Sequence, residues 1–508
     1  MNIKLFLILL MVIQFSGLSQ NIEITKGEIT KDRQFLIDKN EMTACDNKGN
    51  FVALRPHRIN GSLRNYFIEF FNDLNFIERQ EIETKNLTEI LDFFIKDNKI
   101  HVLIRETTSK EISVRFDLFD LFEKQKSSKI LITANKETDK VLYKALKSEN
   151  TLSLDYNSNY LLSFQVLNKE SIYSYLKLFD SNFNLIKSEK ITPNHNSKIK
   201  NISHLNTKLH GKNIYLLYNI QDEEAGNYYK LINISNEKTR ELIIPIEQEF
   251  YQLINSKIEY NNYTICGLYS KKKKGGFQGL AHYNINLTKF EISSSKLSQF
   301  KSEEAKKYFI GLFKANRSLD IKDIFIDTNN NTFIVGQFYT LRKQYAPVGI
   351  PLATFTIGSM AAFITYNPIS TTYKVYDDIL IAKIDASGNL IWDKVLGLKQ
   401  TEKIQSKFNQ KDSSYFAYLK NDQLNILLNG YINPSKEKLV IQQDKRNSKT
   451  NLYNLVISEK GNISSEIFIK NSDSEILFIA EKSIETNHNK IFNLGQGNMR
   501  KQLIKIEL

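Results

Sequence analysis

Short turns rich in Asn and Asp recur along the chain, and an apolar strand follows each of them at once. Eight such strands begin at Phe51, Ile100, Tyr160, Ile214, Tyr263, Thr332, Leu424 and Ile491. Asn and Asp suit these turns because their short side chains bond back to the backbone and tolerate left-handed geometry. A pattern repeated every few tens of residues predicts small stacked sheets, because one such unit cannot bury its own apolar face.

A second pattern follows the first within each unit. In Tyr175–Ile186 and Ile379–Ile391, an alternating strand ends at an Asp, a tight turn carries an Asn, and a new strand starts at Leu-Ile. Each unit therefore reads as a four-stranded antiparallel meander. The predicted units cover residues 41–82, 90–133, 151–192, 201–246, 254–297, 319–398, 412–469 and 475–508. Units of this size in series predict an all-β propeller of eight blades, with seven as the alternative count if an irregular unit is divided differently.

The two ends of the chain suggest how such a ring closes. The last unit offers three strands, near residues 475–481, 490–496 and 501–507, and Ile22–Ile29 reads as one further strand. If this N-terminal strand completes the last blade, the ring has no open sheet edge. The alternative is an unpaired terminal arm. Helices are predicted between units at Lys140–Lys147 and after Ser302, where acidic residues precede basic ones.

Residues 1–19 are typical of a signal peptide. Lys4 precedes an apolar run from Leu5 to Phe15, and Gly17 and Ser19 are the small residues expected before a cleavage point. A retained membrane anchor is the alternative. We expect export to the periplasm, the outer-membrane surface or the extracellular space, with residues 20–508 forming one propeller domain. The composition, heavy in Lys, Asn and Ile, is typical of bacteria.

One blade carries a recognisable element, Lys-Ile-Asp-x-x-Gly-Asn-Leu-x-Trp, at Lys383 to Trp392. The chain resembles the secreted bacterial β-propellers whose blades carry this element. The resemblance extends over most of the chain at the level of blades and implies the propeller fold. It implies no particular activity.

Few residues indicate chemistry. Cys45 and Cys266 are too far apart in sequence to form a disulfide framework and read as buried thiols. His195, His204 and His210 lack the short spacing of metal ligands. Asp327 to Asn331 lacks the glycine and distal glutamate of a calcium loop, so a repeat turn accounts for it. Asp385 is expected to cap its own turn. No nucleotide, hydrolase or metalloprotease motif is present, and no cofactor or metal is expected.

Charge indicates the kind of partner. The formal net charge is +13 at pH 7, which favours acidic partners such as anionic glycans or envelope components, and export argues against nucleic acid. The sharpest basic run comprises Lys271, Lys272, Lys273 and Lys274. A solvated hairpin tip is the plain interpretation of this run, and an anion-binding loop is the functional one.

The segment from Gln344 to Tyr373 has no charged residue and lies within an insertion at about 342–376 in the sixth unit. Two early prolines and two glycines argue against a membrane-spanning helix. The segment is expected either to cover a propeller face or plug the channel, or to contact a protein, a membrane surface or a ligand. Its predicted contact residues are Tyr345, Phe355, Met360, Phe363 and Tyr366.

These observations predict a non-enzymatic binding or scaffolding propeller that recognises a protein or an envelope component through the loops of one face. The alternative is a propeller hydrolase or lyase acting on glycans. Its paired carboxylates would come from different blades and would share no sequence neighbourhood.

Overall fold

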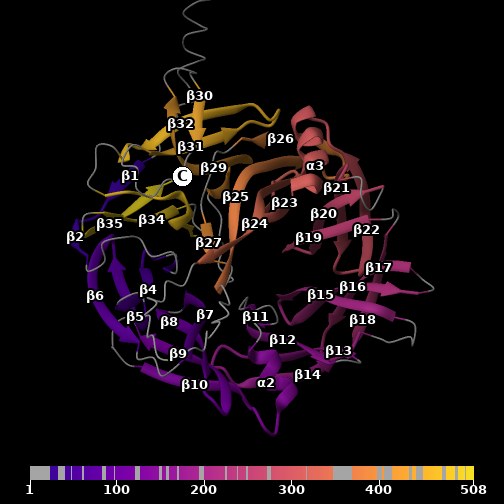
Figure 1. The fold of residues 1–508 in the computed structure, drawn as a ribbon, viewed down its shortest axis with the longest axis horizontal. Helices are drawn as coiled ribbons and strands as arrows, with labels where there is room; N and C mark the ends of the chain where they lie inside the picture. The colour runs from indigo at the N-terminus through magenta and orange to yellow at the C-terminus, as the bar shows by residue number, and fades with distance from the viewer. Residues whose placement is uncertain are drawn as a thin grey trace, which may run out of the picture.

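The computed structural model describes residues 23–507 apart from short gaps. The gaps are 33–40, 47, 60–61, 83–86, 97, 121–125, 148–151, 156–158, 169–170, 194–198, 224–225, 237, 247–249, 272–275, 316, 347–368, 398–402, 406–414, 434–437, 442–449, 472–475, 487–489 and 498. The described strands form eight antiparallel sheets arranged as blades around a ring (Figure 1). The predicted eight-bladed propeller is confirmed, and the alternative count of seven is wrong. The signal peptide predicted at residues 1–19 lies outside the described residues.

Blades 1 to 4 follow the chain in order. Blade 1 contains β3 (Met42–Cys45), β4 (Phe51–Ile59), β5 (Ser62–Asn72) and β6 (Asn75–Ile82). Blade 2 contains β7 (Leu87–Lys96), β8 (Lys99–Thr107), β9 (Glu111–Asp120) and β10 (Lys126–Asn135). Blade 3 contains β11 (Leu152–Asp155), β12 (Tyr160–Asn168), β13 (Ser171–Phe179) and β14 (Leu185–Ile191). Blade 4 contains β15 (Ile199–His210), β16 (Asn213–Asp222), β17 (Gly226–Ile234) and β18 (Thr239–Pro245).

Blades 5 to 8 complete the ring. Blade 5 contains β19 (Phe250–Glu259), β20 (Asn262–Ser270), β21 (Gly279–Asn286) and β22 (Glu291–Gln299). Blade 6 contains β23 (Arg317–Ile326), β24 (Thr332–Ala346), β25 (Ile369–Ile384), β26 (Leu390–Leu396) and β27 (Lys403–Gln405). Blade 7 contains β28 (Tyr415–Lys420), β29 (Gln423–Asn433), β30 (Lys438–Ile441), β31 (Asn451–Ile457) and β32 (Ile463–Ile469). Blade 8 contains β33 (Ser483–Glu485), β34 (Lys490–Gly497), β35 (Arg500–Glu507), β1 (Glu23–Lys26) and β2 (Thr30–Lys31).

The hydrophobic core is divided among the interfaces between blades. Each of the eight apolar clusters found among the described residues joins two neighbouring blades, and the cluster of Leu161, Leu176, Ile214 and Ile232 joins blades 3 and 4. Second strands such as β20 are buried along nearly their whole length, while fourth strands such as β22 are mostly exposed or half-buried. This gradient follows from the radial arrangement, because only the middle strands of a blade are covered by neighbours on both faces.

The N-terminal strand closes the ring, as predicted. β1 pairs antiparallel with β35, with Glu23 opposite Glu507 and Lys26 opposite Ile504. A buried ionic cluster reinforces this closure. Arg55 Nη1 lies 2.8 Å from Asp32 Oδ1 and 3.2 Å from Glu69 Oε2, and Lys501 Nζ lies 2.8 Å from the same Glu69 oxygen. The cluster therefore ties blade 1 to blade 8 and to the segment that follows β2.

The strand predicted at 475–481 is wrong. Leu477 forms only an isolated bridge with Gln496, a 3-10 turn spans Ala480–Lys482, and the inner strand β33 starts at Ser483. Side-chain amides replace a strand partner here. Asn429 Nδ2 donates to the Phe478 carbonyl at 2.9 Å, and the Ala480 amide donates to Asn429 Oδ1 at 2.8 Å. The segment is thus bound to blade 7 by side chains, an arrangement that a strand pattern does not reveal.

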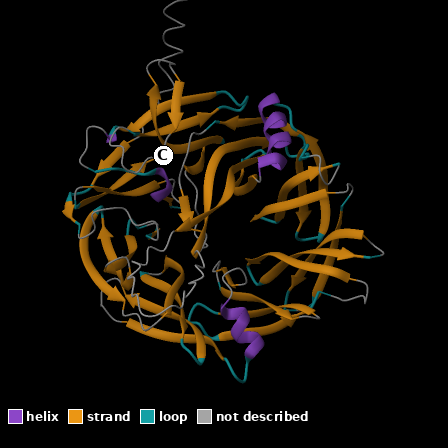
Figure 2. Cartoon of the chain, viewed as in Figure 1, coloured by secondary structure: helices purple, strands orange, loops and turns teal. Residues whose placement is uncertain are grey.

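Both predicted helices are present at the rim of the ring, and the rest of the described chain is almost entirely strand and turn (Figure 2). α2 (Lys140–Lys147) follows blade 2, and α3 (Glu303–Ala315) follows blade 5. The carboxylate of Asp393 accepts hydrogen bonds from the amides of Lys301 and Ser302, which fixes the start of α3 on blade 6. None of the helices in the described part of the chain is long and apolar enough to cross a membrane.

Candidate functional site

The ring has two chemically different faces. Because neighbouring strands in every blade are antiparallel, the hairpins between first and second strands and between third and fourth strands all lie on one face. We call this the turn face; it carries the hairpins Asp46–Asn50, Asp180–Asn184, Asp327–Asn331, Asp385–Asn389 and Ser458–Asn462. The opposite, loop face carries the connections between second and third strands and between blades. These include Ser270–Gly279, the ends of β24 and β25, and the connectors that contain α2 and α3.

The turns of the turn face use their own polar groups. Asp385 Oδ1 accepts from the Asn389 amide at 2.7 Å, and Asp385 Oδ2 accepts from Asn389 Nδ2 at 3.0 Å. Asp327 and Asn331 repeat this arrangement at 2.8 Å for both bonds. The predictions that Asp385 caps its own turn and that Asp327 to Asn331 is a repeat turn are therefore confirmed.

The Lys383 to Trp392 element holds blades together. Lys383 is buried, with its Nζ 3.5 Å from Asp327 Oδ2 and 4.7 Å from the centre of the Phe333 ring. Trp392 Nε1 donates to the Glu459 carbonyl of blade 7 at 2.7 Å, and its ring packs against Gly461. These contacts give the element a structural role.

The uncharged segment emerges from a long hairpin on the loop face. β24 and β25 pair continuously from Thr332 opposite Ile384 to Ala346 opposite Ile369, apart from one irregularity. β23 reaches only Thr340 on β24, and β26 pairs only with Ile379–Ile384 of β25. Residues 341–346 and 369–374 therefore form an extension beyond β23 and β26, about 20 Å long at the usual rise per residue. β27 pairs with Tyr373–Val375 at the base of this extension. The extension points towards the middle of the ring in the view of Figure 1.

The predicted contact residues are only partly described. The backbone of Tyr345 lies in the extension opposite Ser370, while Phe355, Met360, Phe363 and Tyr366 lie outside the described residues. Lys271 is exposed at the end of β20, while Lys272, Lys273 and Lys274 lie outside the described residues. Tyr345 and Lys271 thus belong to the loop face of neighbouring blades.

The three histidines considered for metal binding form no described cluster. His195 lies outside the described residues, and no group of three metal-binding side chains occurs among those that are described. His204 Nε2 lies 2.8 Å from Thr207 Oγ1, and burial lowers the pKa of His204 to about 4. Cys45 and Cys266 are both free thiols; Cys266 is buried as predicted and Cys45 is half-buried.

Sequence reasoning missed a group of charged side chains on inner strands near the turn face. Burial raises the pKa of Glu485 on β33 to about 7, and the opposing charge of Lys257 on β19 counteracts this shift. Lys257 Nζ lies 3.0 Å from Glu259 Oε2 and 5.7 Å from the centre of the Phe325 ring. These residues come from blades 5, 6 and 8, so no local sequence pattern could associate them.

Comparisons with known proteins identify no family for this chain. No family model matches the sequence, and no curated protein sequence matches it. Among solved structures, the WD40 domain of SCAP from fission yeast is 7% identical, with 96% of this chain and 94% of that one covered and a TM-score of 0.39. The β-propeller domain of the Trilobed protease from Pyrococcus furiosus is 9% identical, with 83% and 94% covered and a TM-score of 0.32. The polysaccharide lyase Uly1 is 9% identical, with 89% and 93% covered and a TM-score of 0.35. Similarity at this level assigns no activity or residue, and the fold rests on the ring of eight blades itself.

Proposed function

We propose that the protein is an exported binding or scaffolding propeller that captures a protein partner on its loop face. The observation that supports this proposal is the β24–β25 extension, which continues for six residue pairs beyond the end of β23. A rigid ring that presents irregular projections on one face is the usual arrangement of a recognition scaffold, because loops carry binding residues while the strands fix their position.

The edge of the extension favours a protein as the partner. Beyond Thr340, none of the described strands pairs with the edge of β24 that faces away from β25. An open edge offers backbone donors and acceptors to an extended segment of another chain, which can add to the sheet as a further strand. The exposed Lys271 on the neighbouring blade would favour an acidic segment, and the net charge of +13 would speed the encounter.

A shortened hairpin tests the role of the extension. Thr340 and Val375 are register partners, so residues 341–374 can be replaced by Asn-Gly, which forms a tight hairpin turn and removes all six pairs of the extension. The matched control is Tyr260→Ser, since Tyr260 is 80% exposed on the turn face. Unchanged circular dichroism and melting temperature would show that both variants keep the ring.

Binding is measured by capture from cell-envelope extracts followed by a direct assay with each purified candidate. We expect at least a tenfold loss of affinity for one protein in the shortened variant and none in Tyr260→Ser. Substitution of Lys271 to Lys274 by Gln should slow association and reduce its dependence on salt. Equal capture by all variants would refute the proposal. Cleavage of anionic glycans by the wild-type protein would instead favour the hydrolase or lyase.

Export is tested separately. Fractionation of cells that express the full chain should place the protein outside the cytoplasm, and N-terminal sequencing should start at Gln20, directly after Ser19. Recovery of an uncleaved cytoplasmic product would contradict this part of the proposal without affecting the loop-face experiment.

A further inference from the structure

A pocket of about 390 Å³ lies between blades 2 and 3, away from the β24–β25 extension. Its walls come from β10, the outer strand of blade 2, from α2, and from β12, β13 and β14 of blade 3. This volume is at the lower end of the usual range for small-molecule sites, about 300 to 1,000 Å³. The pocket therefore suits one small ligand and not a polypeptide.

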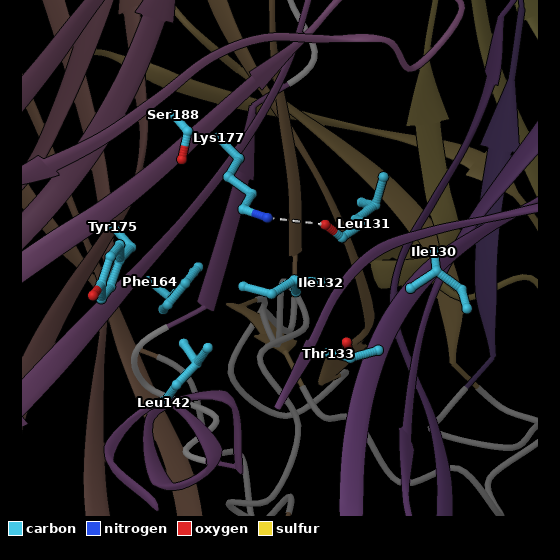
Figure 3. Close-up of a pocket in the computed structure, with 9 residues that line it drawn as sticks. All are labelled: Ile130, Leu131, Ile132, Thr133, Leu142, Phe164, Tyr175, Lys177 and Ser188. Atoms are coloured by element: carbon cyan, nitrogen blue, oxygen red, sulfur yellow. Dashed lines mark hydrogen bonds between the residues drawn. The ribbon is translucent and has the colours of Figure 1, made fainter. Parts of the chain in front are cut away.

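Lys177 supplies the charge in this pocket. Its side chain extends from β13 towards β10, and Nζ donates to the Leu131 carbonyl at 3.3 Å (Figure 3). An ammonium group has three donors, and no described carboxylate forms an ion pair with this one. Burial lowers the pKa of Lys177, and no neighbouring charge counteracts this shift. The partly desolvated cation would be stabilised by an anion placed beside it.

The rest of the lining combines apolar side chains with the hydroxyl groups of Thr133, Tyr175 and Ser188. Phe164 and Ile132 are buried, and Leu142 of α2 lines the same pocket (Figure 3). The Tyr175 ring stacks on Phe164 with 5.3 Å between ring centres. These side chains form a surface that favours aliphatic or aromatic ligand atoms. Lys177 is the one cation among the described lining residues.

We propose that this pocket binds a small amphipathic carboxylate, of the class of a medium-chain fatty acid. The carboxylate pairs with the Lys177 ammonium, and the chain packs against Phe164, Ile132 and Leu142. A phosphate ester fits less well, because phosphate sites normally provide several charged donors or an arginine fork, and Lys177 is the one cation among the described lining residues. Carboxylate binding takes up the free donors of Lys177 and removes apolar lining surface from water.

The test uses decanoate, with decan-1-ol and decyltrimethylammonium as uncharged and cationic probes of similar length. Isothermal titration calorimetry is carried out below the concentration at which the two charged probes form micelles and below the solubility limit of decan-1-ol. We expect one decanoate per chain and at least tenfold weaker binding of both other probes, as loss of a charge-assisted hydrogen bond implies. Equal binding of decanoate and decyltrimethylammonium would overturn the proposal.

Two variants locate the site. Lys177→Met should weaken decanoate at least tenfold and leave decan-1-ol unchanged, because it removes the charge and keeps an apolar side chain of similar length. Lys187→Met is the matched control, since Lys187 lies on β14, outside the lining, and loses the same charge. Unchanged decanoate affinity in Lys177→Met would refute the site.

Photolabelling of the wild-type protein keeps the test independent of how the variants fold. A decanoate analogue with a diazirine group should label peptides that contain Ile132, Leu142 or Phe164, and excess decanoate should prevent this labelling. Labelling confined to other blades would overturn the proposal.

Discussion

Glu485 should make the stability of the ring depend on pH in a direction that can be worked out in advance. Its pKa is about 7 in the folded protein against an ordinary value of 4.5, because burial disfavours the ionised form and Lys257 only partly compensates. A difference of about 2.5 pKa units corresponds to at most about 3 kcal/mol at 1.36 kcal/mol per unit. Since the side chain is only half-buried, solvent screening reduces the expected effect to about 1–2 kcal/mol.

The sign follows from which state holds the proton more tightly. Below pH 4.5, Glu485 is protonated in both states and imposes no penalty. Between pH 4.5 and 7, the unfolded chain loses its proton first, so the free energy of unfolding falls as the pH rises. Above pH 7, the penalty is complete and constant. Glu485→Gln lacks the penalty and should therefore gain stability over the wild type across this window.

Urea unfolding of wild type and Glu485→Gln at pH 4, 6 and 8 measures the effect. His204 and His282 have a pKa of about 4 because of burial and contribute the opposite slope in this window. They are identical in both proteins, so only the difference between the two curves is interpreted. Glu291→Gln, which removes an exposed carboxylate on β22, is the control and should show no such trend. A difference that stays constant from pH 4 to 8, or a variant less stable at pH 8, would refute the reasoning.

Three further substitutions test the structural roles of individual contacts. Arg55→Met leaves Asp32 and Glu69 buried without their shared guanidinium, so it should lower the free energy of unfolding by about 3–5 kcal/mol. The loss should appear as a lower urea midpoint and earlier proteolysis of the N-terminal strand. An unchanged midpoint would show that the ring closes without this cluster. Asn429→Ala removes the acceptor of the buried Ala480 amide and should lower the free energy of unfolding by about 1–3 kcal/mol. Faster hydrogen exchange at the Ala480 amide is the specific readout. Exchange at the wild-type rate would contradict this hydrogen bond. Gly461→Ala should destabilise the protein more than Gly49→Ala. Both residues have positive φ, but only at Gly461 would the added Cβ lie 2.9 Å from the Trp392 ring. Equal melting temperatures for the two variants would show that this contact relaxes freely.

The local part of the fold was predictable from the sequence. Turn residues such as Asp327 and Asn331 make their hydrogen bonds within five residues, and the strands that flank them are set by alternation of apolar side chains. Both signals act over a short stretch of chain and repeat, so the sequence determined the eight blades, the two connecting helices and the closing strand. The error at 475–481 arose where Asn429, some fifty residues away, supplies the hydrogen bonds that a neighbouring strand would otherwise make.

The groupings of residues that are distant in sequence were decided by the tertiary structure. Glu485 and Lys257 come from inner strands of different blades, and the Lys177 pocket combines side chains from β10, α2 and blade 3. The physical reason is that the ring brings residues together by stacking whole blades, so the neighbours of a side chain depend on closure and register and not on sequence distance. The sequence alone specified the uncharged segment and the lysine run. The alternation of strand direction then assigned Tyr345 of the segment and Lys271 of the run to one face.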